Sequence, residues 1–131
     1  VYAARAALGD DVIGGPTDEL ALSRQLLACD VWAFERALDD GRLRDAVAAY
    51  AGPFLEGFHL QESPEFDQWA TRERDRLAAR CAEALETLAG EATARAAHEE
   101  AAGWWTRRLA MDPLHVRATL GAMTTLEAAG D

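Results

Sequence analysis

The chain has 131 residues, 50% of them hydrophobic and 27% charged, which suits one compact globular domain and is too short for two large ones. Acidic residues outnumber basic ones by 23 to 13, and a net charge of −10 makes the chain as a whole a poor binder of nucleic-acid phosphates and of anionic lipid. No apolar run approaches the roughly 20 residues that cross a bilayer, and the first residues lack the pattern of a signal peptide. We therefore expect a cytoplasmic domain without membrane contact.

The first 29 residues predict a short helix followed by a small β-hairpin. Residues 1–8 are rich in alanine and favour a helix. Short apolar segments at 12–13 and 20–22 flank a turn that contains glycine, proline and aspartate, which is typical of a hairpin. A two-stranded sheet is not stable alone, and the chain starts on Val1 rather than Met, so we expect a piece of a larger protein.

From Asp30 onward the apolar residues recur with a helical period. A first helix is expected over 31–38, with Asp30 as its N-cap, and a second over 42–50 after a break at Gly41. The connection is so short that the two helices should pack as an antiparallel hairpin.

Three further helices are expected in the second half of the chain. Ser63 followed by Pro64 is a typical helix start, and the end of that helix is left open because Gly90 falls inside the pattern. The next helix should stop before Pro113, and Asp112 should cap a last helix that ends at Gly130.

Between the second and third helices, segment 52–60 combines glycine and proline with four large apolar residues. A solvated loop rarely has this composition, so we expect Phe54, Leu55, Phe58 and Leu60 to lie between helices. On the long helix, mixed charges that include Arg74 and Arg80 mark the outer face. The predicted hydrophobic core consists of Phe34, Leu38, Val47, Tyr50, Phe54, Phe66, Trp69, Leu77 and Trp105.

No constellation of residues predicts catalysis, a metal or a cofactor. His98-Glu99-Glu100 resembles the start of a zinc-protease helix, but Ala102 stands where the second histidine is needed. Cys29 and Cys81 lie far apart, outside any Cys-x-x-Cys motif, and are expected to be small buried hydrophobes. We expect no enzyme activity, no metal site and no cofactor.

The overall pattern predicts an all-α fold of tetratricopeptide-like antiparallel helical hairpins, with a small N-terminal β-hairpin. Stacked helix pairs of this kind usually present a surface to another protein. The alternative of a coiled-coil seam along the long helix is weakened by irregular apolar spacing and by Arg80.

Motifs that follow one another in a fixed order make the pattern specific. They are Asp-Val-Trp-Ala-Phe-Glu at 30–35, Tyr50 with Gly-Pro-Phe-Leu-Glu-Gly-Phe at 52–58, Glu-Phe-Asp-Gln-Trp at 65–69 with Glu73-Arg74, and Arg-Arg-Leu at 107–109 with Asp-Pro-Leu at 112–114. This order resembles the bacterial transcriptional activator domain of the Streptomyces antibiotic regulatory protein (SARP) family. The resemblance covers residues 30–131 and implies a helical activator domain, truncated at its C-terminus, that contacts RNA polymerase or another copy of itself.

The same resemblance implies that residues 1–29 are the tail of an OmpR-type winged helix, which binds promoter DNA in that family. Residues 1–8 would end the recognition helix, with Arg5 as a DNA contact, and 12–22 would form the wing. A ligand-sensing or scaffolding helical-repeat module is the alternative.

Two departures from the family pattern are visible. Ala96-Ala97 stand where the family usually carries Gly-Asp, which predicts a softer or shifted break. The last helix has a second apolar side around Leu120 and Met123, which we expect to be exposed or covered by another copy.

Overall fold

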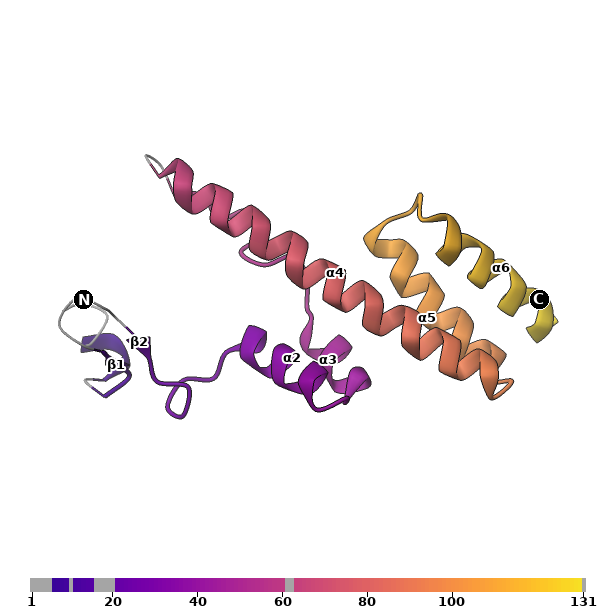
Figure 1. Ribbon diagram of the computed structural model, residues 1–131, viewed down its shortest axis with the longest axis horizontal. Coiled ribbons are helices and arrows are strands. Elements are labelled where there is room, and N and C mark those ends of the chain that lie inside the picture. Colours follow the sequence, from indigo (N-terminus) through magenta and orange to yellow (C-terminus); the bar gives the residue numbers. More distant parts are fainter. Residues whose placement is uncertain (1–5, 10, 16–20, 61–62, 131) are drawn as a thin grey trace.

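A computed structural model describes residues 6–9, 11–15, 21–60 and 63–130, and it confirms a mostly helical chain with a small sheet near the N-terminus (Figure 1). Residues 6–8 are helical. Strand β1 (Ile13–Gly14) pairs antiparallel with β2 (Ala21–Leu22), as the hairpin pattern predicts. Arg5, the predicted DNA contact, lies outside the described residues.

Helices α2 (Asp30–Asp39) and α3 (Leu43–Ala49) form the first helical pair. The break between them falls at Gly41, whose φ of 72° is accessible to glycine at little cost. The N-cap of α2 is Cys29, so the expectation that Asp30 takes this place is wrong by one residue. The Asp30 carboxylate instead accepts a hydrogen bond from the Val31 N–H at 2.8 Å, within the first turn.

Helix α4 (Pro64–Ala94) has 31 residues and is the longest element in Figure 1. Helix α3 packs directly against it. It begins as predicted, with Ser63 at the N-cap and a proline at its first position. The helix continues through Gly90, where a Cβ atom would meet no other atom within 4 Å. Gly90 therefore costs helix propensity without ending the helix.

Helices α5 (His98–Met111) and α6 (Val116–Ala129) complete the fold, α5 packing on both α4 and α6. The break before α5 falls at residues 95–97, between the end of α4 at Ala94 and His98. Ala96 adopts a φ of 57°, so the turn is tight and the expectation of a softer break is wrong. Asp112 does not cap α6. That role belongs to His115, whose Nδ1 accepts the Ala118 N–H at 3.3 Å, and Gly130 ends the helix in the left-handed conformation, as predicted.

The hydrophobic core has two parts along α4. The first lies against α2 and α3 and contains Phe34, Val47, Leu77, Cys81 and Leu85. The second lies among α4, α5 and α6, where Ala89, Ala118 and Ala122 surround the buried ring of Trp105. Small residues in the second part let three helices approach closely around one large ring.

The structure places four of the predicted core residues as expected: Val47, Phe34, Leu77 and Trp105 are 0%, 2%, 3% and 7% exposed. The half-buried ones are Leu38, Tyr50, Phe54 and Phe66. Trp69 is 42% exposed, so the expectation that its ring belongs to the core is wrong. It lies in the first two turns of α4, before the part of that helix that lines the core, and its ring contacts are with Phe54 and Phe66.

Candidate interaction surfaces

Arg74 fixes the irregular segment that precedes α4. Its Nε donates to the carbonyl of Phe54 at 2.6 Å, and its Nη2 donates to the carbonyls of Leu55 at 2.8 Å and Phe58 at 3.4 Å. Leu55 and Gly57 both have positive φ values, 50° and 71°, so the backbone turns tightly here and directs its carbonyls to one guanidinium. One side chain of α4 thus holds the turn in place.

Aromatic rings from this segment meet those at the start of α4. Trp69 packs edge-on against Phe54 with ring centroids 5.6 Å apart, and Phe66 lies 5.5 Å from Trp69 and 5.8 Å from Phe58. The rings cover one another only in part. Leu55, Phe58 and Leu60 are 37%, 47% and 42% exposed, so the expectation that they lie between helices is wrong for these three. We call Leu55, Phe58, Leu60, Phe66 and Trp69 the aromatic surface.

Acidic residues are close in the sequence to the residues of this surface. Glu56 lies within residues 54–58, the turn held by Arg74, which we call the clamped turn. Glu65 and Asp67 are in the first turn of α4. His59 Nδ1 is 3.8 Å from the Asp67 carboxylate. An exposed apolar patch with an acidic border is complementary to a partner with apolar side chains bordered by Arg or Lys.

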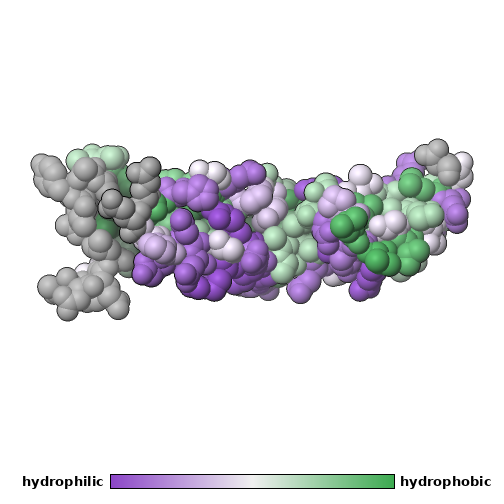
Figure 2. Space-filling model, turned by 90° about the horizontal axis from the view of Figure 1, so that it is seen from above, coloured by the Kyte–Doolittle hydropathy of each residue, from purple (hydrophilic) through white to green (hydrophobic). Residues whose placement is uncertain are grey.

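A second apolar surface, the α6 face, consists of aliphatic side chains. Leu120 and Met123, which the sequence singled out, are 59% and 56% exposed, and Figure 2 shows hydrophobic atoms gathered at the end of the molecule opposite the N-terminus. Aliphatic faces of this kind in stacked helical repeats are the faces that a further helix covers. Its members are Leu114, Val116, Leu120, Met123 and Leu126.

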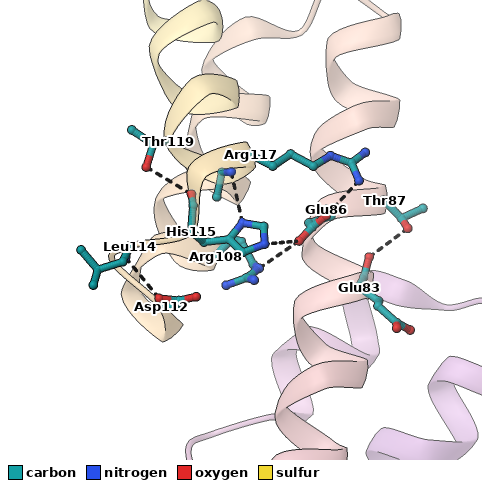
Figure 3. Close-up of polar contacts among 10 residues, drawn as sticks. Glu83, Glu86, Thr87, Arg108, Asp112, Leu114, His115, Arg117 and Thr119 are labelled. Atoms are coloured by element: carbon teal, nitrogen blue, oxygen red, sulfur yellow. Dashed lines mark hydrogen bonds and ion pairs between the residues drawn. The ribbon is translucent and has the colours of Figure 1, made fainter.

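A polar cluster connects α4, α5 and α6 (Figure 3). Glu86 Oε1 lies 3.1 Å from Nε of the buried Arg108 and 3.8 Å from Nε2 of His115, and Glu86 Oε2 lies 3.4 Å from Nη1 of Arg117. Because the other ring nitrogen of His115 caps α6, all four side chains serve to position helices. The cluster joins the three helices by ion pairs and has a structural role.

Among the described residues there is no group of three or more His, Cys, Asp or Glu side chains that could hold a metal ion. Cys29 and Cys81 are free. Cys81 is buried as predicted, whereas Cys29 is only half-buried, so the expectation of burial is wrong for Cys29, which lies at the N-cap of α2. Within the same residues, no helix has both the length and the apolar character that crossing a bilayer requires.

The sequence pointed to Arg74 but not to what it does. Glu73-Arg74 is one of the motifs on which the family resemblance rests, while helical spacing places Arg74 among the mixed charges of the outer face. Its partners are backbone carbonyls at a distance of 16 to 20 residues. No side-chain pattern encodes such partners.

The family model described as Bacterial transcriptional activator domain matches residues 23–131. The chain belongs to this family. In this bacterial transcriptional activator domain the match begins before α2 and includes every helix from α2 to α6. Neither the curated proteins nor the solved structures gave a match. The family assigns the domain to transcription regulators of the activator type, and it agrees with the helical hairpins seen here.

Proposed function

We propose that the helical domain, residues 30–131, activates transcription by protein–protein contact with RNA polymerase, and that the aromatic surface is the contact. Two features support this choice over the α6 face. Aromatic side chains supply a large share of binding energy at protein interfaces, and the Arg74 hydrogen bonds hold them ready for binding. The activity is contact rather than catalysis, and its setting is the cytoplasm, where promoter and polymerase meet.

The acidic border determines the kind of polymerase surface that fits. Glu56, Glu65 and Asp67 favour a partner site with basic side chains around apolar ones. Charged borders mainly raise the rate of association, and salt screens them. Binding should therefore weaken with added salt through slower association, while the apolar contacts keep dissociation nearly constant.

A capture experiment tests the proposal with the 131-residue chain immobilised and purified bacterial RNA polymerase holoenzyme in solution. Replacing Phe58 and Leu60 by serine should lower capture about tenfold, since one exposed aromatic and one exposed aliphatic side chain are lost. The matched control replaces Leu120 and Met123, two side chains of similar exposure on the α6 face, by serine and should leave capture unchanged. Loss in the control but not in the first variant would move the contact to α6 and overturn this choice.

We further propose that residues 1–29 belong to a winged helix that contacts promoter DNA. The helical residues 6–8 and the antiparallel β1–β2 pair, with Ile13 opposite Leu22, are consistent with the end of a recognition helix and a wing. A gel-shift assay of the 131-residue chain with promoter fragments tests this proposal. Specific binding that survives about 200 mM salt would support it, and the absence of specific binding would count against DNA recognition by residues 1–29.

A further inference from the structure

A groove of about 570 Å³ runs between the segment after α3, one side of α4 and the last turns of α5. This volume falls within the range of about 300–1,000 Å³ that is usual for small-molecule sites. Its walls are mostly apolar and include side chains of Pro53, Cys81, Leu85 and Met111. Neither of the two apolar surfaces described above includes these residues, so the groove is a separate feature of the domain.

Few polar groups line the groove, and one of them is a cation free of carboxylate partners. Arg107 makes no ion pair with any described residue. Its Nη2 donates to the Val47 carbonyl at 3.2 Å, and its guanidinium carbon lies 5.5 Å from the Trp104 ring centroid. A guanidinium has five N–H donors, so most of those of Arg107 are available. In a chain with a net charge of −10, such an arginine beside an apolar groove favours an anion.

The other charged groups of the groove offset each other. Arg74 lines the groove, but its Nε and Nη2 donate to the carbonyls of the clamped turn. The exposed Asp75 follows Arg74 on α4 and also lines the groove. Arg107 is therefore the group that selects the charge of a ligand. Its field reaches the groove wall: burial raises the pKa of the Cys81 thiol, and the charge of Arg107 acts in the opposite direction.

Tyr50 contributes a neutral hydrogen-bond donor on the same wall. It lines the groove, and its hydroxyl makes no hydrogen bond to any described residue. Burial raises its pKa above the ordinary value, so the hydroxyl keeps its proton at neutral pH. An apolar groove with one cation and one neutral donor matches a ligand that carries a single carboxylate on an apolar body.

We propose that this groove binds a small carboxylic acid, with its carboxylate on Arg107 and its apolar body along Cys81, Leu85 and Met111. The role is distinct from polymerase contact and gives the domain a place where a metabolite can act on it. Binding is non-covalent, and the aromatic surface takes no part in it. The neighbouring hollow, which shares Tyr50, is lined by Asp30 in place of an arginine and does not suit an anion.

The test is a titration of the ¹⁵N-labelled 131-residue chain, followed by NMR, with 4-phenylbutyrate and with octanoate as probes. At least one should give saturable shifts, centred on the backbone amides of Ala51, Ala78 and Ala110 along the groove, at concentrations up to about 10 mM. The neutral 4-phenylbutan-1-ol has a similar apolar body without the charge and should bind at least about tenfold more weakly.

Arg44 provides a matched control for Arg107, because its guanidinium carbon also lies over Trp104, 5.6 Å from the ring centroid, yet it does not line the groove. Arg107→Gln should weaken probe binding about tenfold or more, and Arg44→Gln should change it less than about twofold. Equal losses in both variants, equal binding of acid and alcohol, or no saturation by either acid would overturn the proposal. Because no polymerase is present, these outcomes are independent of the proposed function.

Discussion

The first turns of α4 and the rest of that helix differ in how deeply their apolar side chains are buried. From Leu77 to Ala92 the helix buries a series of apolar side chains against α2, α3, α5 and α6. In its first turns only Ala70 is buried, and the aromatic residues beside it are left partly open. The difference follows from what lies alongside: helices in one part, and one irregular turn held by Arg74 in the other.

This contrast separates a packed part of α4 from a part that carries partly exposed aromatic side chains. Where α4, α5 and α6 meet, the side chains that face one another are either small or deeply enclosed. Beside the first turns of α4, where a turn and not a helix packs against it, aromatic rings cover one another in part, with centroids 5.5 to 5.8 Å apart. Partly covered aromatic groups stay accessible without unfolding the domain.

The two tryptophans of these regions give the largest expected effects and test the contrast directly. Trp105→Ala should lower the free energy of unfolding by about 3–5 kcal/mol, because the ring is 7% exposed and fills the space among three helices. Trp69→Ala should lower it by about 1–2 kcal/mol, since two ring contacts are lost from a site that is already partly open.

Urea denaturation of both variants, followed by circular dichroism, provides the measurement. Equal losses would mean that the aromatic surface is as firmly buried as the core. In that case the distinction between the two parts of α4 would fail.

Two helical glycines sharpen the description of the tightly packed region. At Gly121 an added Cβ would lie 2.4 Å from Cε2 of the buried Trp105, so Gly121→Ala should destabilise the domain by about 1–3 kcal/mol. At Gly103, in the middle of α5, the same Cβ would meet nothing within 4 Å, and Gly103→Ala should stabilise by about 0.5–1 kcal/mol through helix propensity.

Thermal unfolding of the two variants should give shifts of opposite sign from the same chemical change. If both shifts were positive, α6 would have to lie farther from Trp105 than in the structure. If both were negative, Gly103 would have to be in contact with a neighbour.

Local signals in the sequence predicted the helices well and the exposure of single side chains less well. Ser63-Pro64 and Asp112-Pro113 mark helix ends through constraints on one or two residues, and the structure has both where expected. Whether Trp69 is covered depends instead on how far α2 and α3 extend along α4, which no local pattern contains. Helical spacing predicted the face of α4 on which Trp69 lies, but not which element packs against that face.

The candidate surfaces depend in the same way on distant contacts. The sequence pointed to Leu120 and Met123, because the last helix has apolar residues on two sides. Both side chains are exposed in the structure. The aromatic surface needed the backbone of the turn, where Leu55 takes a positive φ and the carbonyls converge on Arg74. The groove needed three elements at once, so Arg107 and Tyr50 were not associated with each other in the sequence.

A smaller effect is expected at the sharp turn between the two long helices. Ala96 has a φ of 57°, a conformation that costs a residue with a Cβ atom roughly 1–2 kcal/mol and glycine much less. Ala96→Gly should therefore raise the free energy of unfolding by about 0.5–1 kcal/mol, after the greater chain entropy of glycine is deducted. Ala97→Gly, one residue later and without a positive φ, should destabilise under the same denaturant titration.

The smallest expected effect concerns Glu100, which connects α5 to α3. Its carboxylate accepts a hydrogen bond from Trp104 Nε1 at 3.2 Å and pairs with Arg44 of α3 and with Arg95. The hydrogen bond from Trp104, assisted by these two charges against partial burial, lowers the pKa of Glu100 below its ordinary value. A carboxyl group whose pKa is lower in the folded state stabilises the fold above its unfolded-state pKa, and this contribution disappears as the pH falls through the folded-state value.

Glu100→Gln should accordingly lower the melting temperature at pH 7, with a difference from the unmodified chain that narrows as the solution is acidified. Glu99→Gln is the matched control, because Glu99 is exposed in the same first turn of α5 and pairs with no described residue. Any interaction of charge with the helix N-terminus is common to both, so only Glu100→Gln should report the contact with α3. A pH-independent difference, or the same difference for both variants, would mean that this link between α3 and α5 contributes nothing to stability.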